Sequence, residues 1–396
     1  MKIAIFTDTF LPQVNGVVTA TISLAKNLAD RGHKIYIICP KFNGTSYFKH
    51  KNIQIIRMGS IPAYFYEDFR FTAPVSFKLF NFLKKEKIDI IHFQTQMPLG
   101  IQAIILSKLL KIPLIGTFHT NIADPDYLKH IKLNNKYVQN ISWIYNRFYY
   151  NRCDLITCPS EVTREELLKS GFKEPIKAIS NGINLNIFNN SNWKQVKKKY
   201  NKKGKILLFV GRIAHEKNIF YLLDCFKLIL KKVPNTKLLV VGDGPQMTQL
   251  KQKIKDLKVS NNIILTGRIA HEKLIKSSIF KISDLFVTAS TTETQGISTL
   301  EAQANGLVCV GINKGGIKNL IKDNYNGFLV ERNNKKKFAD RIIQILTDKN
   351  LYKKMRINTL KEIKKHDISK ITGIWEKEYT KLIKKYNPIN KQSNLL

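Results

Sequence analysis

Short apolar runs alternate along the chain with longer segments in which apolar residues recur every three or four positions. The first apolar run covers residues 2–6. After a loop, the segment 17–31 carries one apolar stripe and ends before Gly32. Runs of this length are typical of buried strands, whereas the longer periodic segments are typical of amphipathic helices. Strands separated by helices predict the α/β class, in which helices cover a parallel sheet.

The alternation of strand and helix occurs twice. The first set of strand-like runs covers residues 2–6, 34–40, 89–93, 113–119, 154–160 and 176–180. After a lysine-rich stretch, the second set covers residues 205–211, 237–244, 262–267, 284–290, 307–312 and 327–330. We therefore expect two similar α/β domains, residues 1–183 and 184–370.

The last predicted helix covers residues 371–386. Its apolar stripe is formed by Trp375, Tyr379 and Ile383, and we expect this stripe to cross back and pack on the first domain. The alternative is a helix that stays on its own domain. Residues 371–396 are thus expected to form a returning helix followed by a frayed tail.

The composition is that of a globular protein. The chain has 396 residues, of which 43% are hydrophobic, and this length favours two hydrophobic cores. No apolar run is long enough to span a bilayer, and the first residues form a strand rather than a signal peptide, so we expect a cytoplasmic location. The five cysteines are scattered without a CxxC pair, which favours free thiols.

The net charge is unusually high. The chain has 66 Lys plus Arg against 29 Asp plus Glu, which gives +37. A field of this sign attracts anionic surfaces, either nucleic acid or an anionic membrane. Lysine accompanies abundant Asn and Ile, so codon bias of an AT-rich genome is an alternative source of part of the excess. No recognised nucleic-acid-binding motif is present, so we expect no specific nucleic acid as a partner.

Two segments, 77–87 and 137–152, combine aromatic residues with cations. This composition suits an interfacial helix that lies on anionic lipid, and the alternative is an ordinary helix that covers the first sheet. The candidate membrane-binding residues are Phe77, Lys78, Phe80, Lys84, Lys85, Trp143 and Arg147. We expect a peripheral protein on the cytoplasmic side of the membrane.

Two glutamates stand eight positions apart in the stretch 290–306. A strand-like run leads into Glu293, and Glu301 falls about one turn into the following helix. The first amides of a helix have no intrahelical partner and carry the positive end of its dipole, so they can hold an anion between the two carboxylates. Carboxylates accept hydrogen bonds from hydroxyls, and the stretch therefore indicates a nucleotide-sugar site. The alternative is a solvated loop glutamate and a surface helix glutamate.

Polar residues follow several other predicted strands. Arg212 and Lys217 come after the run 205–211, and arginine with lysine is a usual pair for a diphosphate. Gly16 precedes a helix, where glycine lets a phosphate approach the backbone amides. His119 ends a buried run and can reach a substrate hydroxyl. A solvated lysine, a turn glycine and a structural histidine are the corresponding alternatives.

Several known motifs are absent from the sequence. There is neither a GxGxxG nor a Walker A loop, and no Ser/His/Asp nucleophile or metal-binding carboxylate cluster stands out. We therefore expect no tightly bound cofactor and no requirement for a divalent metal. The heptapeptide GRIAHEK occurs at 211–217 and again at 267–273, and the second copy has no assigned function.

The ordered motifs FTDTFLPQVNGV, GTFHTN, SNGINLNIF, VGRIAHEKN, VGDGP and ETQGISTLEAQANG extend from residue 6 to residue 306. Together they resemble the retaining glycosyltransferases of family four, and in particular the bacterial enzymes that glucosylate diacylglycerol. The resemblance implies the GT-B fold, with two Rossmann-like domains that face an interdomain cleft. The sequence departs from the family at Asn218, where a glycine is usual, and at Gln295, where many relatives have an aromatic residue.

The resemblance also implies roles for individual residues. In the donor site, Gly16, Arg212 and Lys217 would meet the diphosphate, Glu301 the ribose, and Glu293 the sugar, helped by Gly296, Ile297 and Ser298. His119 would meet the far hydroxyl of the sugar. Glu293, His119, Arg212 and Lys217 are thus the candidate catalytic residues.

The implied reaction moves glucose from UDP-glucose to 1,2-diacylglycerol with retention of configuration. Another donor, such as GDP-mannose or UDP-galactose, or another acceptor, such as a glycolipid or a soluble sugar, remains an alternative. A basic nucleic-acid-binding protein is an alternative from another class.

Overall fold

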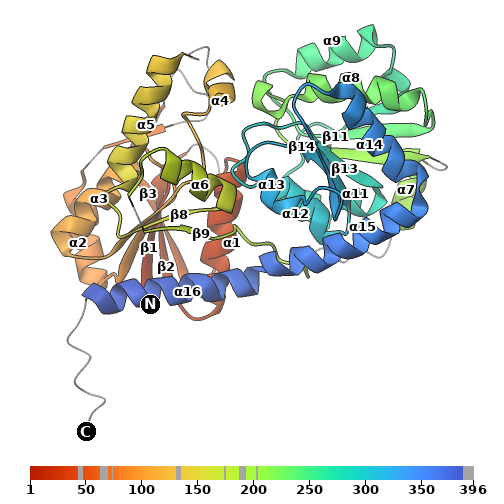
Figure 1. Ribbon diagram of the computed structural model, residues 1–396. Helices are drawn as coiled ribbons and strands as arrows, with labels where there is room; N and C mark the ends of the chain where they lie inside the picture. The colour runs from red at the N-terminus through yellow and green to blue at the C-terminus, as the bar shows by residue number, and fades with distance from the viewer. Residues whose placement is uncertain are drawn as a thin grey trace. The chain divides into compact units, whose positions relative to one another are not determined.

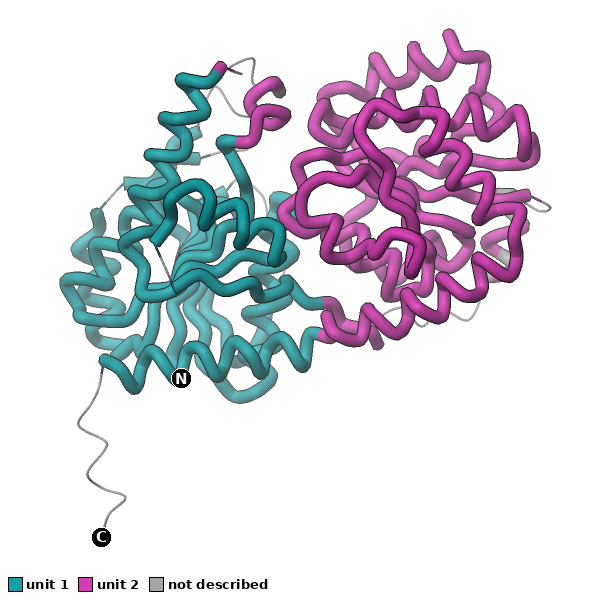
Figure 2. The backbone as a smooth tube through the Cα atoms, in the orientation of Figure 1, with its two compact units in different colours: residues 1–123, 136–182, 368–396 teal, residues 124–135, 183–367 magenta. Residues whose placement is uncertain are grey.

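The computed structural model describes residues 1–42, 48–62, 70–73, 75–130, 135–173, 175–186, 193–201 and 204–386. The chain forms two compact units (Figure 2). Unit 1 comprises Met1–Ala123, Lys136–Gly182 and Ile368–Leu396, and unit 2 comprises Asp124–Asn135 and Ile183–Asp367.

Unit 1 contains a seven-stranded parallel sheet in the order β3-β2-β1-β6-β7-β8-β9. Its strands are β1 (Lys2–Phe6), β2 (Lys34–Pro40), β3 (Ile53–Met58), β6 (Ile90–Phe93), β7 (Leu114–Thr117), β8 (Leu155–Cys158) and β9 (Ile176–Ala178). The short strands β4 (Ser60–Pro62) and β5 (Arg70–Thr72) pair antiparallel with each other. The helices of unit 1 are α1 (Gly16–Asp30), α2 (Phe77–Glu86), α3 (Pro98–Leu110), α5 (Lys136–Tyr150), α6 (Glu161–Lys169) and α16 (Ile368–Tyr386).

Unit 2 contains a six-stranded parallel sheet in the order β12-β11-β10-β13-β14-β15. Its strands are β10 (Lys205–Val210), β11 (Thr236–Val241), β12 (Ile263–Leu265), β13 (Leu285–Thr288), β14 (Val308–Ile312) and β15 (Gly327–Val330). Its α-helices are α4 (Pro125–His130), α7 (Trp193–Asn201), α8 (Ile219–Leu230), α9 (Met247–Asp256), α10 (His271–Lys276), α11 (Ile279–Ile282), α12 (Ile297–Ala304), α13 (Ile317–Leu320), α14 (Lys335–Thr347) and α15 (Lys349–Glu362). Short 3₁₀ turns are η1 (His215–Lys217), η2 (Ser260–Asn262) and η3 (Ile363–His366).

Both sheets are doubly wound. In each, the first strand of the unit lies inside the sheet and the strand order reverses beside it, between β1 and β6 in unit 1 and between β10 and β13 in unit 2. Ligands of such sheets bind beyond the carboxyl ends of the strands at this reversal. The predicted α/β class with two Rossmann-like domains is confirmed.

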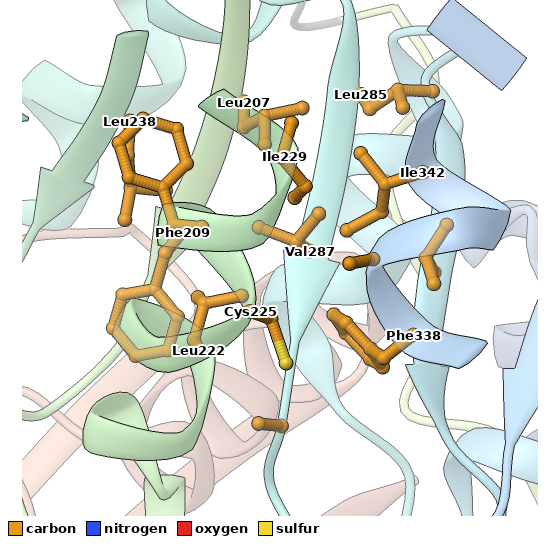
Figure 3. Packing of buried hydrophobic residues seen from close by; sticks show 14 of the residues in the cluster. Leu207, Phe209, Leu222, Cys225, Ile229, Leu238, Leu285, Val287, Phe338 and Ile342 are labelled. Atoms are coloured by element: carbon orange, nitrogen blue, oxygen red, sulfur yellow. The ribbon is translucent and has the colours of Figure 1, made fainter. Parts of the chain in front are cut away.

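Each sheet is covered on both faces, because alternate residues along each strand point to opposite sides. In β10, Leu207 and Phe209 belong to one buried cluster with Leu222 of α8 and Phe338 of α14 (Figure 3). Leu208 belongs to the cluster on the opposite face. Burial on both faces explains why these strands are continuous apolar runs in the sequence.

The last helix, α16, packs on unit 1, as predicted (Figure 1). Trp375 and Tyr379 are buried in the cluster that contains the β1 residues Ile3 and Ile5, and Ile383 packs partly buried against it. Helix α16 begins at Ile368, three residues before the predicted start.

The segment 124–135 was expected within the first domain, but it groups with unit 2. The cause is Asp126, whose carboxylate accepts hydrogen bonds from Arg332 at 2.8 and 3.0 Å and from Lys314 at 2.7 Å. Burial alone would raise the pKa of Asp126, but these two cations hold it down at about 2. The segment is therefore tied to unit 2 by ionised groups.

Candidate active site

The end of β11 lies between the two GRIAHEK copies. The amide of Gly211 donates to Val241 O, and the amide of Gly242 donates to Gly267 O, both at 3.0 Å. A Cβ atom on Gly242 would lie 1.9 Å from Gly211 O, and its φ is +146°, so only glycine fits there. The glycine at the start of each copy therefore packs against the same turn.

Lys217 and Glu293 form an ion pair at the strand reversal of unit 2. Lys217 follows β10 and Glu293 follows β13, and both side chains are only 24% and 19% exposed. Burial alone would lower the pKa of Lys217 and raise that of Glu293. The opposite charge of the partner outweighs burial in each case, so the pKa of Lys217 is raised and that of Glu293 is lowered. Both groups are thus charged at neutral pH.

The loop that carries Glu293 is fixed by its backbone. The amide of Gly316 donates to Glu293 O at 2.7 Å, and a Cβ atom on Gly316 would lie 1.8 Å from Thr294 O. The amide of Thr291 also donates to Glu216 O, beside Lys217. The pair Gly315-Gly316 therefore serves close packing against this loop, and the amide of Gly316 is already used within it.

Helix α12 begins directly after this loop at Ile297. Its N-cap is Gly296, with a φ of +98° and no side chain to cap the helix. The amides of Thr299 and Leu300 donate to Gly296 O, both at 3.1 Å. The amides of Ile297 and Ser298 come earlier in the turn and have no acceptor within the helix, which suits them to an anion.

Glu301 is buried in the second turn of α12. Only 2% of the residue is exposed, and its Oε1 accepts a hydrogen bond from His271 Nε2 at 2.5 Å. Burial alone would lower the pKa of His271, but Glu301 and then Glu272 raise it. A solvated surface glutamate is therefore not what the structure contains.

Sequence reasoning missed His271. Its signal was the second GRIAHEK copy, in which His271 begins α10 as His215 begins η1 in the first copy. Arg212, in the first copy, is exposed. Its positive charge repels that of Lys217 and so slightly opposes the rise in the pKa of Lys217.

The predicted site residues of unit 1 also lie at carboxyl ends of strands. Gly16 is the first residue of α1, after an N-cap in which Asn15 Oδ1 accepts from the amide of Val18 at 3.0 Å. His119, after β7, donates from Nε2 to Gln94 Oε1 at 2.7 Å.

A buried chain of hydrogen bonds continues from Gln94. Its amide nitrogen donates to His92 Nε2 at 2.9 Å, and His92 Nδ1 therefore donates to Tyr379 OH on α16, at 2.8 Å. Burial lowers the pKa of His92 to about 3 and that of His119 to about 4. Both rings are thus neutral at pH 7, and His92 is a structural residue.

The structure places the candidate membrane residues on α2 and α5. Phe77 is 82% exposed at the start of α2, beside the exposed Lys78, Lys84 and Lys85, whereas Phe80 packs partly against the core. On α5, Trp143 packs edge-on against Phe172, and Arg147 donates to Ser170 O at 2.7 Å.

Helix α5 carries an apolar stripe on its other side that the sequence analysis did not single out. The stripe consists of Tyr137, Ile141, Ile144 and Phe148, which are between 46% and 75% exposed. Their spacing of four, three and four residues places them on one helical face. In the part of the chain that the structure describes, none of the helices combines the length and apolar character needed to cross a membrane.

The described ranges also contain no cluster of three His, Cys, Asp or Glu side chains suited to a metal ion.

The predicted site residues form two groups. One lies beyond β10 and β13 in unit 2 and contains Arg212, Lys217, Glu293, Gly296, Ile297, Ser298 and Glu301. The other lies beyond β1 and β7 in unit 1 and contains Gly16 and His119.

Comparisons with known proteins agree with this architecture. Alpha-monoglucosyldiacylglycerol synthase of Streptococcus pneumoniae is 34% identical over 83% of this chain and 75% of its own length. The protein of the same name from Acholeplasma laidlawii is 28% identical over 84% and 85%. A GDP-mannose-dependent alpha-mannosyltransferase of Corynebacterium glutamicum is 27% identical over 84% and 77%.

A solved structure of Anabaena HepE in complex with UDP-glucose superposes with a TM-score of 0.76 and 19% identity, covering 96% of this chain and all of that one. This likeness shows the fold, which is that of the GT-B glycosyltransferases. Residues 14–187 match the model of Glycosyltransferase Family 4, and residues 190–362 match that of Glycosyl transferases group 1. The chain is therefore a glycosyltransferase and belongs to family four.

Proposed function

We propose that this protein transfers glucose from UDP-glucose to 1,2-diacylglycerol, with retention, at the cytoplasmic surface of a membrane. The observation that carries the proposal is the pairing of Lys217 with Glu293 at the strand reversal of unit 2, directly before the uncapped start of α12. The similarity to two monoglucosyldiacylglycerol synthases supports glucose as the sugar and diacylglycerol as the acceptor.

The donor would be bound by groups of both signs. The diphosphate would lie against Arg212, Lys217 and the amides of Ile297 and Ser298, since cations and free helix amides both stabilise an anion. Gly16 would contribute its amide to the same phosphates. Glu301 would accept hydrogen bonds from the ribose hydroxyls.

The sugar would be held by the remaining candidates. Glu293 would accept hydrogen bonds from its hydroxyls, with the amide of Gly296 nearby. His119 would meet the far hydroxyl as a neutral ring, because its pKa is about 4. Gln94 accepts from Nε2 and so fixes the tautomer in which Nδ1 is the acceptor nitrogen of His119.

In the proposed reaction, the bond between the anomeric carbon and the diphosphate oxygen breaks, and its electron pair stays on the diphosphate. The acceptor oxygen attacks the anomeric carbon from the same face and gives its proton to the departing phosphate oxygen. The barrier falls when the negative charge on the leaving group is stabilised, which is the role proposed for Arg212, Lys217 and the α12 amides. Glu293, paired with Lys217, would also face the positive charge that develops on the sugar ring.

The acceptor would be presented by a membrane. Helix α5 offers an exposed apolar stripe, and Phe77 with its neighbouring lysines offers a second apolar and basic patch. Apolar side chains next to cations are typical of surfaces that sit at an anionic bilayer interface. These surfaces support a lipid acceptor over a soluble one.

The test is a transfer assay with mixed micelles of diacylglycerol and anionic lipid. UDP-glucose, UDP-galactose and GDP-mannose, each labelled in the sugar, are offered separately, and the labelled product is identified. The proposal requires labelled glucosyl-diacylglycerol with UDP-glucose and an α configuration of the product. If only GDP-mannose or only UDP-galactose gives a labelled product, that nucleotide sugar is the donor and UDP-glucose is not. If the labelled product is a soluble sugar, the acceptor is not diacylglycerol.

A further inference from the structure

The two GRIAHEK copies occupy similar places in unit 2. Each follows a strand, each places its first glycine against the turn at Gly242, and each begins a helical turn at its histidine. Their side chains then reach different carboxylates. Lys217 of the first copy pairs with Glu293, and His271 of the second copy pairs with Glu301. The repeat thus supplies one basic partner to each glutamate of the stretch 290–306.

The contact between His271 and Glu301 has the properties of a built pair. The side chain of Glu301 is only 3% exposed, whereas that of His271 is 31% exposed and so extends from solvent to the buried carboxylate. A carboxylate removed from water is stable in its charged form only when it is paired and hydrogen-bonded. His271 meets this need through Oε1 of Glu301.

We propose that His271 is a positioning residue of the nucleotide site, which holds the Glu301 carboxylate in place to bind the ribose hydroxyls of the donor. This inference rests on the proposed function, in which Glu301 binds the ribose. Because His271 is bound to Oε1, it fixes the plane of the carboxyl group. Oε2 and the remaining lone pair of Oε1 are then the acceptors for a ribose diol. The second GRIAHEK copy is thereby assigned to recognition of a ribonucleotide.

The test measures the preference for a ribose over a deoxyribose. Dissociation constants of UDP and 2′-deoxy-UDP are determined by calorimetry for the wild type, His271→Ala and His271→Gln. Both ligands carry the same phosphates, so the ratio of the two constants reports the 2′-hydroxyl alone. The wild type should bind UDP at least about tenfold more tightly than 2′-deoxy-UDP, as expected for one hydrogen bond to a charged group.

His271→Ala should weaken UDP binding by about tenfold and should weaken 2′-deoxy-UDP, which keeps only the 3′-hydroxyl of the diol, by clearly less, so that the preference is reduced. His271→Gln keeps an N–H donor and should restore most of the preference. The matched control is His215→Ala, which removes the exposed histidine of the first copy and should leave the ratio unchanged. Thermal unfolding of each variant identifies any that does not fold. If His271→Ala does not fold, the preference of His271→Gln is compared with that of the wild type instead.

The possible outcomes separate the inference from the proposed function. If the wild type binds neither ligand, the proposed nucleotide site is wrong. If the wild type prefers UDP and His271→Ala keeps the same preference, the assignment of His271 is overturned. An equal loss for both ligands would also overturn it, since a purely structural residue would weaken both alike.

Discussion

Glu293 and Glu301 illustrate how the same residue type is paired with a basic side chain in two different ways. Glu293 is partly exposed and pairs with a lysine, which carries its charge at any physiological pH. Glu301 is almost fully buried and pairs with a histidine, whose pKa is raised by that carboxylate and by Glu272 against the effect of burial. The two carboxyl groups on either side of the α12 N-terminus are therefore each paired with a basic side chain from outside the helix.

Replacing Lys217 by alanine should impair both stability and catalysis. The change leaves Glu293 without its cation, which should cost about 1–2 kcal/mol for a pair that is neither fully buried nor fully exposed. It also removes charge stabilisation of the leaving group, so kcat/KM should fall by about 10²–10³-fold. Lys273→Ala, at the same position of the second copy and exposed, is the control for both measurements. Wild-type kcat/KM in Lys217→Ala would contradict the proposed role.

Replacing Arg212 by alanine should impair catalysis alone. Arg212 is exposed, so the free energy of unfolding should change by less than about 0.5 kcal/mol. If Arg212 clamps the diphosphate, kcat/KM should fall by about 10²–10³-fold. The corresponding arginine of the second copy, Arg268, is also exposed, and Arg268→Ala should have a much smaller effect. A near-normal rate for Arg212→Ala would count against the electrostatic clamp.

At this scale, the sequence predicted where the charged residues stand but not which residues they contact. Lys217 and Glu293 could be placed together because both follow strands, and the carboxyl ends of parallel strands meet at one edge. The contact between His271 and Glu301 depends on how a loop and a short helix fold back, and no local pattern encodes this. In the sequence, the repeated heptapeptide was the signal that pointed to His271.

Among the elements, β6 and α16 are linked by a fully buried polar contact. His92 on β6 is completely buried. It is hydrogen-bonded to Tyr379 of α16 and lies against Trp375 in a tilted arrangement, with ring centroids 4.8 Å apart. A protonated His92 would bring an unpaired charge into this core. The neutral form is therefore a condition for the docking of α16.

Protonation of His92 in acid should consequently remove the contribution of His92 to the stability of unit 1. The pKa of His92 is about 3 in the folded chain, against an ordinary value of 6.5 for histidine, so the unfolded chain binds more protons between these two pH values. The contribution of neutral His92 to the free energy of unfolding is complete above pH 6.5. It should be lost as the pH falls toward 3, by up to about 1.4 kcal/mol per pH unit. Urea unfolding followed by tryptophan fluorescence at pH 8, 6, 5 and 4 measures this slope. His92→Gln cannot titrate and should show a shallower slope.

The stripe on α5 gives a second prediction at the scale of one element. The double variant Ile144→Ser and Phe148→Ser removes two exposed apolar side chains, each worth about 1 kcal/mol when buried in part by lipid. Flotation with anionic vesicles should fall by about tenfold or more, while UDP binding is unchanged. The matched control is Ile357→Ser with Leu360→Ser, two exposed apolar residues of α15 in unit 2. Equal flotation of both variants would exclude the stripe as the membrane surface.

Most elements were predicted from apolar runs. An edge strand of the first sheet, the ends of several strands and the exposed face of α5 were not. Strand β3 was missed because Gln54 and Arg57 interrupt its apolar run at the edge of the sheet. The predicted strands also extended one to three residues too far into the loops, as for β7 and β13. On α5, composition alone could not show that Trp143 lies on the packed side and Ile144 on the exposed side.

The whole molecule repeats one topology, with chemistry at the same edge of each sheet. Both sheets reverse their strand order beside the first strand of the unit. Gly16 follows β1 and Arg212 follows β10, so a candidate site residue follows the first strand of each unit. This equivalence explains why the alternation of strand and helix was sufficient to predict two domains, since neither unit needs the other to bury its sheet.

The net charge of +37 belongs to the whole molecule, and salt distinguishes its two possible origins. If the excess lysine serves membrane binding, flotation with anionic vesicles should exceed flotation with neutral vesicles. It should also fall as NaCl rises from 0.05 to 1 M, because the Debye length then shrinks from 10 Å or more to about 3 Å. The residual binding at 1 M salt should depend on the α5 stripe and disappear in the Ile144→Ser, Phe148→Ser variant. If neutral and anionic vesicles bind alike at every salt concentration, the charge does not direct the protein to lipid, and codon bias is the better account of it.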